Sequence, residues 1–218
     1  TRMLAEPAEA VAKSLSGHRA PPAILTIFGA GGDLTKRLVV PALYNLVRAG
    51  KLSDDFAIIG VDHSEQTTEE WRQSLTEMMR ASTLGGHEQQ VASIDEKAWS
   101  WLTRRMHYLR GDFMQPETYG QLGKLLMDPQ VRQNDTANVL FYLAVADRFF
   151  GPVIEQLGRA GLTRQSERAW RRVIVEKPFG HDLASAAALN AQILKTLSED
   201  QIYRIDHFLG KETVQNMM

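Results

Sequence analysis

The chain has 218 residues, a formal net charge of −1 and no cysteine. The balanced charge argues against a nucleic-acid-binding surface, and the lack of thiols excludes disulfides, thiolate metal sites and cysteine nucleophiles. No apolar run approaches the roughly 20 residues that cross a bilayer, which argues against a membrane protein. A cysteine-free composition fits a reducing compartment, and we expect a cytoplasmic protein. Residues 1–22 are polar and alanine-rich without the apolar core of a signal peptide, which predicts a flexible N-terminal tail.

Short apolar runs alternate with segments of helical spacing from residue 23 onward. Strands are predicted over residues 23–28, 56–61, 106–110, 138–144, 172–176 and 201–205. Helices are predicted over residues 41–50, 67–80, 96–105, 116–126, 150–160 and 183–197. Such alternation is typical of a doubly wound, Rossmann-like α/β domain, whose mostly parallel sheet carries helices on both faces. We assign residues 23–206 to a domain of this class. Thr67 and Glu70 are spaced as a capping box for the second helix, and Gly50 and Gly161 are placed to end two others.

A glycine turn, Gly29-Ala30-Gly31-Gly32-Asp33-Leu34, follows the first predicted strand. Glycines at this point let the backbone approach a pyrophosphate, whose charge the amides of the next helix can bind. The turn is not a Walker A loop, because no Gly-Lys-Ser/Thr follows it. It also departs from G-x-G-x-x-G, since Thr35 stands where the spacing from Gly29 would place a third glycine. The turn therefore indicates either a dinucleotide site or a plain tight connection between strand and helix.

The end of the second predicted strand decides the cofactor in domains of this class. An acidic residue there binds the ribose 2′-hydroxyl of NAD, whereas a cation accommodates the 2′-phosphate of NADP. The sequence offers both, in Asp62 and His63. A solvated strand end with no ligand is the third interpretation, and the pattern does not choose among them.

Lys177 follows the fifth predicted strand, in the segment Glu176-Lys177-Pro178-Phe179-Gly180. A lysine at the carboxyl end of a parallel strand would face the ligand crevice, where its ammonium can bind phosphate or sugar oxygens. The Lys177–Pro178 bond is one at which a cis peptide is possible. The alternative is a strand that ends in a Pro-Gly turn with an exposed lysine.

The densest group of ionisable residues begins at the end of the last predicted strand. Its sequence is Arg204-Ile205-Asp206-His207-Phe208-Leu209-Gly210-Lys211-Glu212. His207 and Lys211 are four residues apart, so on a helix that begins near Asp206 they would share one face and could grip a phosphate. Asp206 could orient an imidazole from elsewhere in the fold. The alternative is an N-cap aspartate with surface charges. The other histidines show no ligand-like spacing, and we expect no metal site.

Three of these segments, in the same order along the chain, resemble the signatures of the glucose-6-phosphate dehydrogenase family. They are the glycine turn continued by Thr35-Lys36-Arg37, the Glu-Lys-Pro-Phe-Gly segment from Glu176, and the Arg-Ile-Asp-His string from Arg204. The resemblance runs from about residue 23 to the end. It implies an NADP-dependent oxidoreductase of carbohydrate metabolism. The reaction of that family is hydride transfer from C1 of glucose 6-phosphate to NADP, which yields 6-phosphogluconolactone, in the first step of the oxidative pentose phosphate pathway of glucose metabolism.

The resemblance also implies roles for single residues. The residues that would bind the cofactor are Gly29, Gly31, Gly32, Asp33, Leu34, His63, Tyr142 and Lys177. Lys177 would also contact the sugar, and His207 and Lys211 would hold the phosphate of glucose 6-phosphate. Asp206 would orient the catalytic histidine, the general base that removes the C1 hydroxyl proton.

The sequence departs from the family pattern at three places. Phe208 replaces a usual tyrosine, so a phosphate-binding hydroxyl is lost. Val145-Ala146-Asp147 replaces a usual Pro-Pro beside the nicotinamide. His63, preceded by Asp62, replaces the arginine that commonly receives the 2′-phosphate. NADP is the family's usual cofactor, and from the last departure we expect weakened discrimination against NAD.

The family's catalytic histidine lies well past the Asp-His pair, in a second domain built on an antiparallel sheet. The present sequence contains neither, and residues 207–218 would be the truncated start of that substrate domain. We therefore expect a polypeptide of these residues alone to bind cofactor without oxidising glucose 6-phosphate. A homo-oligomer is expected for a full-length enzyme. The alternative is a catalytically inactive nucleotide-binding module, which would have no need of His207 and Lys211.

Overall fold

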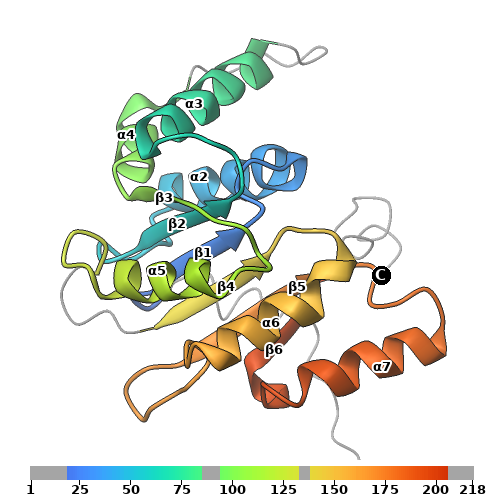
Figure 1. Cartoon of the computed structure of the whole chain (residues 1–218). Coiled ribbons are helices and arrows are strands. Elements are labelled where there is room, and N and C mark those ends of the chain that lie inside the picture. Colours follow the sequence, from blue (N-terminus) through green and yellow to red (C-terminus); the bar gives the residue numbers. More distant parts are fainter. Residues whose placement is uncertain (1–18, 85–93, 133–137, 206–218) are drawn as a thin grey trace, which may run out of the picture.

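The structure, a computed structural model, describes residues 19–84, 94–132 and 138–205. Its centre is a six-stranded parallel sheet in the order β3-β2-β1-β4-β5-β6 (Figure 1). The strands are β1 (Ile24–Phe28), β2 (Ala57–Asp62), β3 (Met106–Arg110), β4 (Val139–Leu143), β5 (Arg171–Glu176) and β6 (Ile202–Ile205). The strand order reverses between β1 and β4, where doubly wound folds bind ligands at the carboxyl ends of their strands. The predicted fold class is confirmed.

Helices cover both faces of this sheet (Figure 1). The helices on one face are α2 (Val40–Arg48), α3 (Thr68–Leu84) and α4 (Glu96–Thr103). The helices on the other face are α5 (Pro116–Met127), α6 (Phe150–Arg159) and α7 (Leu183–Ile193). Within the described ranges, no helix is both long and apolar enough to cross a membrane.

The two layers of helices give the molecule two apolar clusters, one on each face of the sheet. All five residues of β1 are buried, because a central parallel strand is covered from both sides and so has no polar face. The cluster under α2, α3 and α4 includes Ile27, Ile58, Trp71 and Trp99. The cluster under α5, α6 and α7 includes Phe28, Phe141, Tyr119 and Phe150. The sheet is therefore a rigid platform that fixes the carboxyl ends of its strands.

The first helix begins earlier than the predicted residue 41. Helical backbone starts at Asp33 and passes through a π-helical turn, Thr35–Val39, before α2. Val40 N–H closes this turn by donating to the carbonyl of Thr35, five residues back. Pro41 explains the wider turn, because proline has no amide to donate and its ring crowds the carbonyl four residues earlier. The sequence pattern alone placed the start of the helix at this proline.

Most other boundaries agree with the sequence to within a few residues. The capping box is confirmed, since Thr67 N–H donates to Glu70 at 2.7 Å and Glu70 N–H donates to the Thr67 hydroxyl at 3.2 Å. Gly50 (φ +64°) and Gly161 (φ +72°) follow α2 and α6 in the left-handed conformation that suits glycine. The helix predicted to reach residue 197 ends at Ile193, because its last bonds tighten to spacings of three residues.

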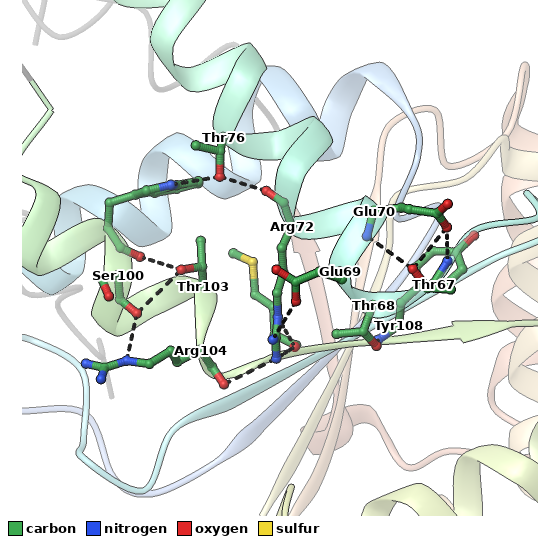
Figure 2. A network of polar contacts seen from close by, with 12 residues as sticks. Thr67, Thr68, Glu69, Glu70, Arg72, Thr76, Ser100, Thr103, Arg104 and Tyr108 are labelled. Carbon is green, nitrogen blue, oxygen red and sulfur yellow. Dashed lines mark hydrogen bonds and ion pairs between the residues drawn. The ribbon is translucent and has the colours of Figure 1, made fainter.

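A polar network fastens α3 and α4 to the start of β3 (Figure 2). The Arg72 guanidinium donates to the carbonyl of Met106 at 2.6 and 3.0 Å. At the same edge, Tyr108 N–H donates to the Thr68 hydroxyl at 2.9 Å. These bonds pair the backbone of an outer strand with side chains of the helix above it. They stabilise the outer part of the sheet.

Candidate functional site

The glycine turn lies where the ends of β1, β2 and β4 meet. Gly29 has φ +86°, and a Cβ atom at this position would lie only 2.3 Å from the carbonyl oxygen of Ala144. Gly29 N–H donates to Val61 at 2.9 Å, and Ala144 N–H donates to Phe28 at the same distance. Glycine is therefore required at position 29 both by its conformation and by the close approach of the chain after β4.

Thr35 closes the turn from the far side. Its hydroxyl donates to the carbonyl of Gly29 at 2.8 Å, and the side chain is fully buried. Gly32 N–H donates to the same carbonyl at 3.0 Å. Sequence reasoning treated Thr35 as a departure from a glycine fingerprint. The structure shows instead that a hydroxyl at this position holds the turn shut, a role that the spacing of glycines could not indicate.

Asp33 and Leu34 form the first helical turn after the glycines, and the Asp33 side chain is exposed. Its carboxylate forms an ion pair at 3.1 Å with Arg37, which is also exposed. The first amides of a helix have no acceptor within the helix, so this end can bind an anion. The structure thus brings Gly29, Gly31, Gly32, Asp33 and Leu34 together at the carboxyl edge of the sheet.

Asp62, the last residue of β2, is buried beneath the turn with 5% of its surface exposed. Oδ2 of its carboxylate accepts a hydrogen bond from Gly31 N–H at 2.7 Å. Oδ1 accepts one from His63 N–H at 2.7 Å and lies 2.9 Å from His63 Nδ1. The His63 imidazole projects outward with 83% of its side chain exposed. Three residues that the sequence singled out therefore form one connected group.

Trp71 of α3 supports the same turn from below. Its indole N–H donates to the carbonyl of Ala30 at 3.1 Å. The ring fits there because Gly60 has no side chain; a Cβ atom on Gly60 would lie 2.6 Å from the ring. The backbone of the turn is thus held both by the Asp62 carboxylate and by the Trp71 indole.

Tyr142 of β4 lies beside Glu176, the last residue of β5. The Tyr142 hydroxyl donates a short hydrogen bond to the Glu176 carboxylate, and both side chains are buried. Burial, together with the hydrogen bond and the charge of Glu176, raises the pKa of Tyr142 well above its usual value. Tyr142 therefore remains a hydrogen-bond donor at neutral pH. Sequence reasoning missed this use of Glu176, although a carboxylate at the end of an apolar strand was a visible signal.

Lys177 follows Glu176 directly and is exposed at the same edge of the sheet. The Lys177–Pro178 peptide bond, at which the sequence allowed a cis form, is cis. Gly180 then brings the chain against the start of α7, where a Cβ atom on Gly180 would lie 2.5 Å from the amide nitrogen of Ala186. In the adjoining loop, His181 Nε2 lies 3.4 Å from Asp147 Oδ2, so the chain after β5 contacts the chain after β4.

The rest of the predicted site lies outside the described residues. These positions are Asp206, His207 and Lys211, together with the helix predicted to carry them. The last described residue, Ile205, pairs in register with Glu176. Within the described ranges, no cluster of histidine, aspartate and glutamate could hold a metal ion. A hollow of about 820 Å³ between the ends of α6 and α7, lined by Arg159, Arg164 and Lys195 among others, contains none of the predicted site residues.

The topology and the glycine turn define a Rossmann-like dinucleotide-binding domain. A family model described as "Glucose-6-phosphate dehydrogenase, NAD binding domain" matches residues 26–216. The chain therefore belongs to the glucose-6-phosphate dehydrogenase family and contains its nicotinamide-cofactor-binding domain.

Curated relatives agree with this assignment. Glucose-6-phosphate 1-dehydrogenase of Chlamydia pneumoniae is 39% identical over 206 residues, which cover 93% of this chain and 39% of that protein. The Bacillus subtilis enzyme is 37% identical over 200 residues, which cover 92% of this chain and 38% of that protein. The chain thus spans about two fifths of the length of these relatives.

Solved structures agree as well. A glucose-6-phosphate dehydrogenase in complex with its substrate, glucose 6-phosphate, superposes with a TM-score of 0.76 at 33% identity, over 92% of this chain and 39% of that one. The Mycobacterium avium glucose-6-phosphate 1-dehydrogenase gives a TM-score of 0.71 at 37% identity, over 90% of this chain and 38% of that one.

Proposed function

We propose that the protein takes part in the NADP-linked oxidation of glucose 6-phosphate. The reaction removes hydride from C1 of the sugar and yields 6-phosphogluconolactone, the first step of the oxidative pentose phosphate pathway. Family membership supports this proposal, and one observation carries it for this chain: the turn after β1 packs against the chain after β4 only because Gly29, at φ +86°, has no side chain. The cysteine-free composition fits a cytoplasmic site of action.

The described residues fit a dinucleotide cofactor. Gly31 and Gly32 place partly exposed backbone at the start of a helix, which suits the binding of a pyrophosphate. The residues proposed to contact the pyrophosphate are Gly29, Gly31, Gly32, Asp33 and Leu34. His63 would lie at the adenosine ribose, and Tyr142 and Lys177 would lie towards the nicotinamide. When bound, the nicotinamide ring supplies the hydride acceptor. NADP is the proposed cofactor, with NAD as a weaker second.

The substrate contacts are proposed from the matching motifs. Lys177 would bridge the sugar and the cofactor, and the cations of His207 and Lys211 would hold the sugar phosphate. Phe208 offers no hydroxyl to that phosphate. Asp206 would orient the general-base histidine of the family, which removes the proton of the C1 hydroxyl as hydride leaves C1. In that family the histidine lies in a second domain, which residues 207–218 are proposed to begin.

This division of roles predicts binding without turnover for a polypeptide of these 218 residues. The measurement is a calorimetric titration with NADP and with NAD, followed by an assay for reduced cofactor in the presence of glucose 6-phosphate. We expect a dissociation constant for NADP and no reduction. Reduction by this polypeptide alone would contradict the assignment of the base to the second domain. Failure to bind either nucleotide would contradict the proposed function itself.

The second candidate is a nucleotide-binding module without catalysis. It differs from the first in the fate of glucose 6-phosphate, which a pure nucleotide binder would not recognise. A titration with glucose 6-phosphate in the presence of NADP separates the two, with Lys211→Ala as the variant that removes the proposed phosphate contact. Weak binding that Lys211→Ala abolishes supports the dehydrogenase. A full-length enzyme of this kind is proposed to form a homo-oligomer.

A further inference from the structure

The carboxylate of Asp62 is already engaged at the point where a dinucleotide ribose would arrive. An ionised carboxylate offers about four lone-pair positions, two on each oxygen. Oδ1 is used by two nitrogens of His63, the backbone amide at 2.7 Å and Nδ1 at 2.9 Å. Oδ2 is used by Gly31 N–H at 2.7 Å. The side chain is 7% exposed.

This geometry does not suit the usual role of an acidic residue at the end of β2. A carboxylate that recognises NAD accepts hydrogen bonds from the ribose hydroxyls, so it needs open acceptor positions facing the ligand. Oδ1 has both acceptor positions filled, and the one position left on Oδ2 belongs to a side chain that is 7% exposed and bonded to the glycine turn. Turning Oδ2 towards a ribose would take the acceptor away from Gly31 N–H in the partly buried turn, which is costly.

We propose that Asp62 is a positioning residue, which locks the glycine turn through Gly31 and orients His63 as the group that selects the 2′-phosphate of NADP. This inference rests on the proposed function, because it assumes a nicotinamide dinucleotide at the turn. It differs from the expectation drawn from the sequence, in which the replacement of an arginine by His63, preceded by Asp62, weakens the discrimination against NAD.

The orientation of His63 follows from its two bonds to one oxygen. With its backbone amide and Nδ1 both directed at Asp62, the ring presents Nε2 to solvent. With Nδ1 held by the carboxylate, an Nε2–H points away from Asp62 and can donate to a phosphate oxygen. Neighbouring charged groups at this edge are already paired: Arg110 with Glu65 at 2.8 Å, and Arg37 with Asp33 at 3.1 Å.

The test measures dissociation constants for NADP and for NAD with the wild-type protein and with Asp62→Asn. Under the proposal both affinities fall, that for NADP by about 10-fold or more, because a charge-assisted bond to the turn is lost and His63 loses its support. The ratio of NADP to NAD affinity then stays level or falls. If Asp62 is a ribose ligand, NAD affinity falls while NADP affinity holds or rises, and that result overturns the proposal.

Two further variants keep the test decisive if Asp62→Asn does not fold. His63→Gln changes an exposed side chain, and it should weaken NADP about 10-fold while leaving NAD within about twofold. Equal NADP affinity in His63→Gln and the wild type would overturn the proposal. Asp54→Asn serves as the matched control. Asp54 is an exposed aspartate in the loop that precedes β2, and it forms an ion pair with Arg19. Neither the NADP affinity nor the NAD affinity should change in this variant.

A pH series adds a readout that a merely structural role would not alter. The advantage of the wild type over His63→Gln in NADP affinity should shrink as the pH rises from about 5 to about 8, where histidine side chains lose their proton. The variant is the reference because the 2′-phosphate itself gains charge near pH 6. An advantage independent of pH would overturn the role of His63. A wild-type protein that binds neither nucleotide would instead refute the proposed function.

Discussion

Strands β2 and β5 both end in a buried carboxylate on the face of the sheet that carries α2, yet the two carboxylates bind different partners. Asp62 is 5% exposed and accepts hydrogen bonds from the backbone of the glycine turn and of His63. Glu176 is 4% exposed and accepts one from the hydroxyl of Tyr142, a side chain on the neighbouring strand. The first carboxylate fixes main chain that a ligand would touch. The second fixes the spacing of β4 and β5 beside Lys177.

The comparison predicts that damage to the glycine turn held by Asp62 weakens cofactor binding, whereas damage near Glu176 lowers stability without changing the preference between cofactors. A carboxylate that holds a loop contributes to the shape of that loop, and the rest of the core does not depend on it. A carboxylate in a buried pair between strands belongs to the packed interior, where an interrupted hydrogen bond is costly. Three substitutions test this difference, in order of decreasing effect.

Gly29→Ala should have the largest effect, because it distorts the glycine turn that Asp62 holds. The new methyl group would lie 2.3 Å from the Ala144 carbonyl, and alanine at φ +86° is strained. Left-handed backbone costs about 1–2 kcal/mol and overpacking about 1–3 kcal/mol, so we expect a loss of about 2–5 kcal/mol in the free energy of unfolding. Cofactor binding should be lost. Urea denaturation and calorimetric titration measure the two effects.

Gly50→Ala is the matched control. Gly50 has φ +64°, but a Cβ atom there would meet no atom within 4 Å. Only the conformational cost of about 1–2 kcal/mol should appear, with unchanged cofactor affinity. Equal losses of stability in the two variants would show that the contact with Ala144 contributes nothing and that glycine is not obligatory at position 29.

Tyr142→Phe should remove the hydrogen bond that joins β4 to Glu176 of β5. Removing a donor from a buried carboxylate costs about 1–3 kcal/mol in the free energy of unfolding. The ratio of NADP to NAD affinity should not change, because the Asp62 group is intact. Tyr203→Phe on β6 is the control, since Tyr203 is exposed and its loss should barely alter stability. A changed ratio of NADP to NAD affinity in Tyr142→Phe would contradict the different roles assigned to Asp62 and Glu176.

The same tyrosine makes stability depend on pH in alkali. The folded protein raises the pKa of Tyr142, whereas tyrosines of the unfolded chain titrate near pH 10. The stabilisation is therefore complete below about pH 10 and declines as the pH rises towards the raised value. Tyr119, whose pKa is also raised by burial, contributes in the same direction. As the pH rises from neutral to alkaline, the free energy of unfolding should therefore fall less for Tyr142→Phe than for the wild type.

Thr35→Val sharpens the comparison with the smallest change. It replaces a buried hydroxyl that donates to Gly29 with a methyl group of similar size, at a cost of about 1 kcal/mol. Thr118→Val removes a similar bond, from the Thr118 hydroxyl of α5 to the carbonyl of Asp112 at 2.8 Å, which does not involve the glycine turn. Stability should fall to a similar extent in both, whereas cofactor affinity should fall only in Thr35→Val. Identical affinities would mean that the hydroxyl does not shape the turn.

The fold could be read from the sequence because its signals are local. Apolar runs of strand length, helical spacing, capping residues and punctuating glycines each occupy a few neighbouring positions, and they placed the strands of the sheet to within about two residues. The start of the helix at Asp33 was missed because Pro41 suggests a helix start. Its compatibility with a π-helical turn depends on backbone geometry that residue patterns do not encode.

The site could be located but not understood from the sequence. Asp62 was recognised as a candidate, but its partner, Gly31, is separated from it by 31 residues and becomes a neighbour only when β1 and β2 pair. The same holds for Tyr142 and Glu176, 34 residues apart on β4 and β5. Hydrogen bonds between distant segments depend on strand register, and no local pattern specifies which acceptor a buried group will meet. The roles of Asp206, His207 and Lys211 stay predictions.

The place of Trp71 beneath the glycine turn makes it a natural optical probe of the site. Gly60 admits the indole, whose N–H is bonded to Ala30, so any ligand that settles on the turn changes the electric field at a buried ring. Trp71 is one of four tryptophans in the chain, and its substitution by phenylalanine would identify its share of the emission. Intrinsic fluorescence thus offers a label-free signal of cofactor binding. The signal depends on Gly60, because only a residue without a side chain at this position of β2 leaves room for the indole ring.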